Sequence, residues 1–387
     1  MKHLVQDALS IFLKNTSQST KLEEIASLLP TIKQQGSEKH EILRHQLNQL
    51  GEIKSTAQSF LNILEQLTST IMTHKVEQLQ QSKQYKQKTK EWFDVRKEML
   101  TASSDISDIL GKSEYNGTTD KTIQKKLGFV KAFEGNKFTQ HGNKYEKIAI
   151  QIYEERYDKQ VLEFGLLRHP TIHRLGASPD GITKDGRLVE IKVPYTRIPD
   201  GKIKRGYFIQ MQTQMEVCDL DVCDFFECRI SEYRNKNDYD NDIFCADDIL
   251  FLDICPRTTN LNLINVPNDR RTEDGLEKGM LGRIGYFSTA NDNSYIYPPM
   301  HLTSNEQYQY LKNKQMELKK NGVDMKIDYW RVETSSFQPV KRDRKWWEDN
   351  KVECKIEQVW KQIEAEKEKL QLEKVEKEKC ECVTENE

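Results

Sequence analysis

The run at residues 176–194, GASPDGITKDGRLVEIKVP, constrains this chain more than any other stretch. Asp185-Gly186 is a dipeptide typical of tight hairpin turns, and the residues after it alternate with β-branched side chains. The run therefore predicts a β-hairpin. Because side chains alternate along a strand, Glu190 and Lys192 should share one face of the second strand, with the apolar residues around them on the other face.

A third charged residue in the same run points to metal chemistry. Asp180 lies near the start of the predicted turn region and can face Glu190 across the two strands. Two converging carboxylates provide the oxygen ligands that hard divalent cations prefer, and Lys192 could hold or polarise an attacking water. An isolated Glu-x-Lys is more often a solvated ion pair. The full pattern, with Ser-Pro-Asp-Gly before Glu-x-Lys-Val-Pro, favours a functional site.

A second group of candidates lies upstream of the hairpin. The sequence around Arg96 predicts a short helix that ends near Leu100, followed by a new helix capped by Thr101 or Ser103. An arginine beside a hydroxyl-rich helix start can bind an anion such as phosphate. A plain helix cap with a surface arginine explains the same residues.

Two further helices flank the hairpin in sequence. Residues 139–157 predict an amphipathic helix with Glu146 near its start, which is either a surface glutamate or an acidic group that completes a metal site. Residues 206–217 predict a second amphipathic helix, on which Gln210 and Gln214 share a face and Gln212 points elsewhere. The expected strands are residues 161–168, 222–230 and 249–254.

The rest of the chain divides by composition into flanking segments. A four-three spacing of mainly apolar residues from Leu43 to Ile71 predicts a long helix that pairs with another helix, within this chain or in a second copy. The predicted organisation is a helical extension at 1–82, a basic linker at 83–91, a core at 92–258, an aromatic and basic accessory region at 259–347, and a C-terminal helix with an acidic tail at 348–387. The basic linker is either a solvated connection or a contact to backbone phosphates.

Composition narrows the cellular setting. The net charge is -2, so a path for nucleic acid would have to come from local clusters of basic residues. The sequence has no long apolar run and no secretory pattern at its start, which predicts an intracellular protein without a membrane span. Its eight cysteines form no C-x-x-C pair, which favours reduced structural thiols over a metal or iron–sulphur site.

These motifs together resemble the YqaJ-type viral recombinase family, to which the phage lambda exonuclease belongs, within the PD-(D/E)xK nuclease superfamily. The likeness covers roughly residues 92–230. In chain order the matching motifs are Trp92 with Arg96 and Thr101-Ala102-Ser103, Gly142-Asn143-Lys144-Tyr145-Glu146, Ser178-Pro179-Asp180-Gly181, Glu190-Ile191-Lys192 and Gln210-Met211-Gln212.

The resemblance implies an α/β fold with a restriction-endonuclease-like mixed sheet flanked by helices. It also implies roles for individual residues. Asp180, Glu190, Glu146 and the Ile191 carbonyl would hold Mg²⁺, with Mn²⁺ as a substitute, while Lys192 would orient the water and Gln210 would lie near the site. The residues implied for the 5′-phosphate and DNA are Arg96, Ser103, Ser178, Arg197 and Gln212.

The expected activity is 5′-to-3′ hydrolysis of linear double-stranded DNA in viral or phage recombination, repair or replication. Two alternatives stay open at this point: a structure-specific endonuclease on the same core, and a recombination scaffold with secondary nuclease activity. The resemblance further implies a 5′-phosphorylated duplex as substrate, a homotrimer, and a single-strand annealing protein as partner. A viral or phage protein acting inside the host cell fits these expectations.

Overall fold

The chain divides into two compact units, residues 1–81 and 82–387. The computed structural model describes residues 72–113, 116–130, 135–240, 281–288, 293–299, 302 and 304–384. Of the first unit only residues 72–81 are described, and they are helical. The predicted helix pairing from Leu43 to Ile71 lies outside the described residues, as does the strand expected at 249–254.

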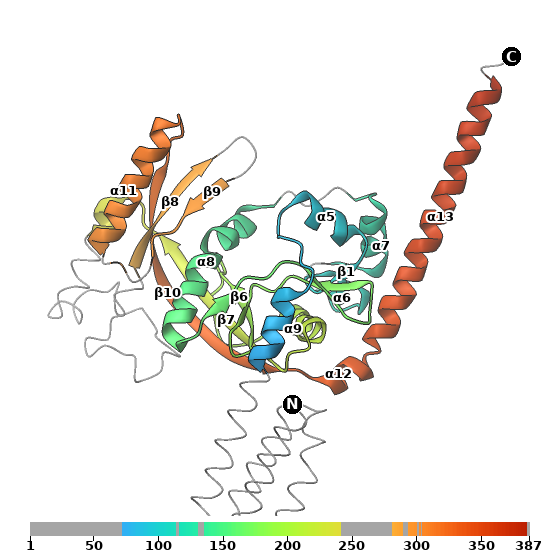
Figure 1. The fold of residues 1–387 in the computed structure, drawn as a ribbon, viewed down its shortest axis with the longest axis horizontal. Helices are drawn as coiled ribbons and strands as arrows, with labels where there is room; N and C mark the ends of the chain where they lie inside the picture. Colours follow the sequence, from blue (N-terminus) through green and yellow to red (C-terminus); the bar gives the residue numbers. More distant parts are fainter. Residues whose placement is uncertain are drawn as a thin grey trace, which may run out of the picture. The chain divides into compact units, whose positions relative to one another are not determined.

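The second unit contains helices and strands in mixed order (Figure 1). Its helices are α5 (Lys90–Lys97), α6 (Asp105–Ile109), α7 (Thr119–Leu127), α8 (Lys137–Tyr157), α9 (Arg205–Cys218), α11 (Ser304–Lys320), α12 (Arg344–Asp349) and α13 (Val352–Thr384). Its strands are β1 (Leu100–Thr101), β2 (Val161–Leu162), β3 (Leu167–Arg168), β4 (Leu175–Ala177), β5 (Gly181–Thr183), β6 (Leu188–Lys192), β7 (Val222–Glu232), β8 (Leu281–Ser288), β9 (Asn293–Ile296) and β10 (Lys326–Lys341).

The strands form two sheets. The larger sheet has the order β2-β5-β6-β7-β10-β8-β9, and all its neighbours are antiparallel except β6 and β7. Helix α9 makes the crossover that two successive parallel strands require. The smaller sheet has the order β1-β4-β3. The predicted mixed α/β fold is confirmed, and so is the long C-terminal helix.

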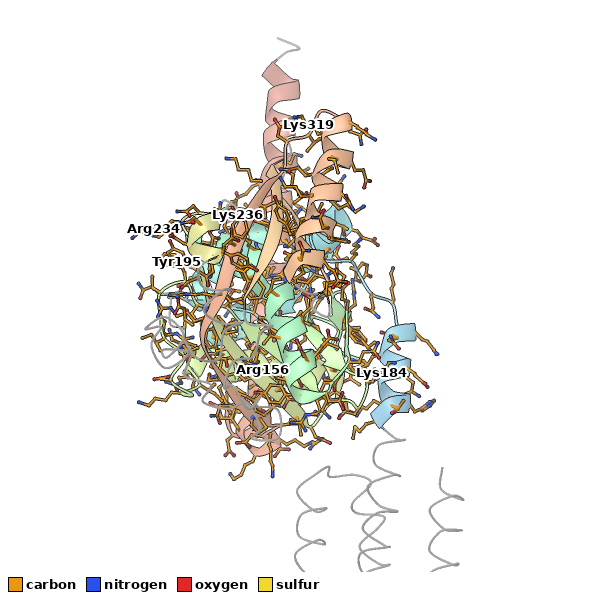
Figure 2. The ribbon with its side chains drawn as sticks, turned by 90° about the vertical axis from the view of Figure 1, so that its left-hand side faces the viewer. Arg156, Lys184, Tyr195, Arg234, Lys236 and Lys319 are labelled. Atoms are coloured by element: carbon orange, nitrogen blue, oxygen red, sulfur yellow. The ribbon has the colours of Figure 1, made fainter. Side chains whose placement is uncertain are left out.

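The expected hairpin is present as β5 and β6. Gly186 in its turn has a φ of 83°, the left-handed conformation that glycine adopts without steric cost. In Figure 2, Lys184 in this turn and Tyr195 beyond the end of β6 lie on opposite sides of the molecule, so β6 crosses the core. The main core lies between α8 and strands β6, β7 and β10 and includes Tyr145, Ile152 and Trp330.

Some expected elements differ from the structure. The strand expected at 161–168 is two short strands, β2 and β3, in different sheets. Thr101 belongs to β1 and not to a helix cap, because β1 pairs in parallel with β4. Helix α6 therefore begins later, after Ser104, whose side chain makes no capping hydrogen bond.

The tryptophans of the expected aromatic region are mainly core residues. Trp330 is buried in β10, a central strand of the larger sheet, and Trp347 is buried in α12. Arg342 pairs with Glu216 and Asp219. Packing thus accounts for these two tryptophans.

Candidate active site

The site is built on the two strands of the hairpin. The register pairs Gly181 with Val189, so Asp180 comes opposite Glu190 one position further on. The Asp180 Oδ2 accepts a hydrogen bond from the Ile191 amide at 2.7 Å. Val189 and Ile191 pack into the main core with α8, which leaves Glu190 and Lys192 on the other face, as the alternation predicted.

Glu190 is fully buried and bonded at both carboxylate oxygens. Its Oε1 pairs with the Lys192 ammonium, and its Oε2 accepts a hydrogen bond from Gln214 Nε2 at 2.9 Å. Lys192 Nζ also lies 5.2 Å from the ring centroid of Tyr207. Helix α9 supplies both Gln214 and Tyr207, and it thereby fixes the carboxylate and the lysine in place.

Sequence reasoning did not select Gln214 or Tyr207 as site residues. The available signal for Gln214 was its place one helical turn after Gln210, on the same face of α9. No sequence pattern singled out Tyr207, because an aromatic residue near a helix start is more often a packing residue.

The carboxylates of this region disfavour one another's charge. Burial raises the pKa of Asp180 well above its usual value, and the nearby charges of Glu190 and Glu146 raise it further. Burial likewise raises the pKa of Glu146. The charges of Lys192 and Lys88 lower this pKa, and the charge of Glu190 raises it further. Burial lowers the pKa of Lys192, but the charges of Glu190 and Asp180 outweigh burial and raise it overall. The lysine therefore keeps its charge among the acids.

The carboxylates of this group are suitable ligands for a divalent cation. The available donors are carboxylate oxygens, which Mg²⁺ and Mn²⁺ accept, and a cation would relieve the mutual repulsion that raises these pKa values. The side chains do not form a closed coordination shell. Within the described ranges, no group of three or more His, Cys, Asp and Glu side chains meets the geometry of a metal site.

A possible anion site lies beside the hairpin. The Arg96 guanidinium stacks on the ring of Trp92 at 4.1 Å from its centroid. The Trp92 indole N–H donates a hydrogen bond to Ser178 Oγ at 3.1 Å. Burial lowers the pKa of Arg96 and Asp105 opposes this shift, so the arginine stays charged. The structure therefore brings Arg96 and Ser178 together, two residues before Asp180.

A buried acid organises the residues behind Arg96. The Asp105 Oδ2 accepts hydrogen bonds from the backbone amide and the hydroxyl of Thr101, both at 2.9 Å. The Thr101 hydroxyl lies 3.2 Å from Ser103 Oγ. Burial raises the pKa of Asp105, but Lys126 and Lys125 outweigh burial and hold it below its usual range. The charged, fully buried carboxylate thus holds the Thr101 hydroxyl directly, and the Thr101 hydroxyl in turn contacts Ser103.

Three other expected site residues lie elsewhere or make other contacts. The Arg197 guanidinium pairs with the buried Glu227 on β7. Gln212 is buried and bonds at both ends of its amide to the backbone of Lys341 and Asp343, at 2.9 and 2.7 Å. Gln210 is half-buried on α9, one turn before Gln214. Gln212 therefore points away from the group formed by the other residues. Arg197 lies next to that group, because Glu227 is opposite Lys192 in the register of β6 and β7 and Tyr207 interacts with both Arg197 and Lys192.

Part of the chain matches a known protein family. Residues 91–221 match the model of the YqaJ-like viral recombinase domain. This range contains all the sequence motifs described above, from Trp92 to Gln212. This domain belongs to the YqaJ-like viral recombinase family.

The chain has a curated relative in a giant virus. The chain is 32% identical over 293 residues to an uncharacterised protein, R354, of Acanthamoeba polyphaga mimivirus. The match covers 69% of this chain and 50% of the relative, so the chain spans about half the length of that protein.

Solved structures of low similarity include two exonucleases. One is the alkaline exonuclease LHK-Exo from Laribacter hongkongensis, with 21% identity and a TM-score of 0.42 over 74% of this chain and 99% of that one. The other is a phage-related exonuclease from Haemophilus somnus 129PT, with 15% identity and a TM-score of 0.36 over 69% of this chain and 96% of that one. Among the described residues, no helix is both long and apolar enough to cross a membrane.

Proposed function

We propose that this protein is a metal-dependent deoxyribonuclease that acts in recombination and hydrolyses linear double-stranded DNA from a 5′-phosphorylated end. The observation that carries the proposal is the group of Asp180, Glu190 and Lys192 on one hairpin, with Gln214 fixing the buried carboxylate. Membership of a viral recombinase family supports the setting in recombination.

Asp180, Glu190 and Glu146, with the Ile191 carbonyl, would hold Mg²⁺, and Mn²⁺ would substitute. When bound, the cation supplies Lewis-acid stabilisation of the charge that develops on the phosphate during hydrolysis. Lys192 stays charged and can hold the attacking water by donating a hydrogen bond to it. Its pairing with Glu190 keeps the ammonium at this position before DNA binds.

Arg96, Ser103 and Ser178 would bind the terminal 5′-phosphate. A guanidinium offers paired donors for phosphate oxygens, and the two hydroxyls add neutral donors. The stacking of Arg96 on Trp92 and the bond from Trp92 to Ser178 hold two of these groups together. Because the next residue but one after Ser178 is Asp180, a phosphate held here would lie near the carboxylates.

Release of nucleotides from duplex DNA tests the proposed activity. With Mg²⁺, the full chain should degrade a linear 5′-phosphorylated duplex and leave covalently closed circular DNA intact. We expect Asp180→Ala and Lys192→Ala each to lower the rate at least about a hundredfold, in the range of losses for single electrostatic groups in active sites. Full activity in either variant would contradict the assignment, and cleavage of the closed circle would favour an endonuclease.

Arg96→Ala tests the phosphate pocket separately. The measured quantity is the ratio of rates on 5′-phosphorylated and 5′-hydroxyl ends of the same duplex. Loss of a charge-assisted contact worth about 1.5–3 kcal/mol should reduce this ratio by about tenfold or more. Lys97→Ala, which removes an exposed lysine of the same helix, is the matched control and should leave the ratio unchanged. An unchanged ratio in Arg96→Ala would reject the pocket.

A further inference from the structure

The basic linker is fixed to the core and is not a free tether. Tyr85 forms a bridge with Leu166, in which the Leu166 amide donates to the Tyr85 carbonyl at 2.8 Å. Gln84 Oε1 accepts a hydrogen bond from the Gly165 amide at 2.9 Å. A Cβ at Gly165 would lie 2.4 Å from the Tyr85 carbonyl oxygen, so only glycine allows this close approach.

Beyond this bridge the linker runs along the segment that carries Asp180. Gln87 Nε2 lies 3.5 Å from the Pro179 carbonyl oxygen, at the long limit for a hydrogen bond. Trp92 Nε1 donates to Ser178 Oγ at 3.1 Å. Lys88 lies between these two attachments in the chain, so its backbone belongs to the segment held beside Ser178 and Pro179.

Lys88 has an unusual backbone and an unpaired side chain. Its φ is 65°, a left-handed conformation that costs a non-glycine residue about 1–2 kcal/mol. Asparagine or glycine would be the usual residue there, and a strained lysine is the kind of outlier found at functional sites. The side chain is exposed and its ammonium makes no hydrogen bond or ion pair with any residue that the structure describes.

The position of this charge matches a need of the substrate. In a strand whose terminal phosphate is held at Arg96, the next phosphate would lie at the carboxylates. Both phosphates would then be beside the linker segment that carries Lys88, which is attached at Pro179 and Ser178.

We propose that Lys88 binds a phosphate of the strand being degraded, beside the terminal-phosphate pocket and the carboxylates. This inference rests on the proposed nuclease function and assigns the linker a part in it. Lys88 is then a substrate-positioning residue that acts mainly on binding, because its contact is made equally before and during hydrolysis.

Three variants of the full chain test the inference. Lys88→Asn removes the charge and keeps a residue that tolerates the left-handed conformation, so the linker should stay docked. Lys88→Arg keeps the charge. Lys86→Asn removes an exposed lysine two residues away, and is the matched control. The probe is a linear 5′-phosphorylated duplex, whose binding is followed by fluorescence anisotropy at several salt concentrations without divalent cation.

In Lys88→Asn, the slope of log K against log salt should become shallower by about 0.9, the value for one lost phosphate contact on duplex DNA. Binding at low salt should weaken by about two- to fivefold, and KM should rise while kcat stays within about twofold. Lys88→Arg should restore the wild-type slope, and Lys86→Asn should keep it.

A wild-type slope in Lys88→Asn would overturn the inference. An equal decrease of the slope in Lys86→Asn would also overturn it, because the effect would then come from the overall charge of the linker. The two proposals fail separately. If the wild type releases nucleotides but Lys88→Asn binds like the wild type, only the role of Lys88 is lost. If the wild type releases none, the nuclease proposal itself fails.

Discussion

His141 in α8 is buried and is neutral in the folded protein at neutral pH. It is 8% exposed, and its Nε2 has no hydrogen-bond partner within the described part of the chain. Its ring lies against Tyr145 and Tyr195, with centroids 4.8 and 5.1 Å away. Burial lowers its pKa from 6.5 to about 4, against the charge of Glu232, which raises it. Protonation of His141 is therefore coupled to unfolding.

This coupling predicts how stability depends on pH. Below pH 6.5 the unfolded chain binds a proton that the folded chain excludes. The free energy of unfolding therefore decreases as the pH is lowered from 6.5 to about 4. The loss due to His141 should reach about 3 kcal/mol. His141→Phe keeps the ring contacts and should show a smaller fall in the free energy of unfolding across this window, measured by urea denaturation. His173→Phe, which replaces an exposed histidine, should follow the wild type. Equal curves for His141→Phe and the wild type would contradict the account.

Individual site residues differ in how far the sequence could predict them. Glu190 and Lys192 could be placed together because strand alternation fixes which side chains share a face. Helical spacing separated Gln212 from the face shared by Gln210 and Gln214, but it could not show which residue of that face reaches Glu190. Gln214 contacts Glu190, whereas Gln212 bonds to the backbone at the end of β10 and just after it, so the position of β10 decides this difference.

At the scale of elements, the local sequence was sufficient to predict those helices and strands whose form depends on neighbouring residues. The β5–β6 hairpin follows from its turn residues, and α8 follows from its apolar spacing. The division of residues 161–168 into two strands follows instead from a distant contact. The amide of Leu166 is taken by Tyr85 and that of Gly165 by Gln84, both in the linker. No local pattern in the strand could reveal that partner.

The start of α6 shows the same dependence on distant residues. A cap at Thr101 or Ser103 was a reasonable expectation from their hydroxyls. In the structure, the Thr101 amide and hydroxyl both bond to Asp105, and Asp105 in turn pairs with Lys125 and Lys126 of α7. A buried acid with two lysine partners from another helix fixes this turn, so the Thr101 hydroxyl bonds to Asp105 and does not cap a helix.

At the scale of the whole molecule, the sheet joins regions that the sequence divides. β10 lies next to β7 in the larger sheet, although a boundary was expected at residue 258 between the two. The match to the recombinase family ends at residue 221, so β7 and β10 lie outside it. The site itself is contained in elements up to α9, and the later strands support it from the other side of β7.

The central claim is that Asp180, Glu190 and Glu146 bind a divalent cation on which hydrolysis depends. Titration of the full chain with Mn²⁺, followed by electron paramagnetic resonance, measures this binding without relying on activity. We expect saturable binding in the wild type and in Glu163→Gln, which removes an exposed acid near Glu146, and its loss in Asp180→Asn and Glu190→Gln. Wild-type Mn²⁺ binding in both Asp180→Asn and Glu190→Gln would contradict the claim.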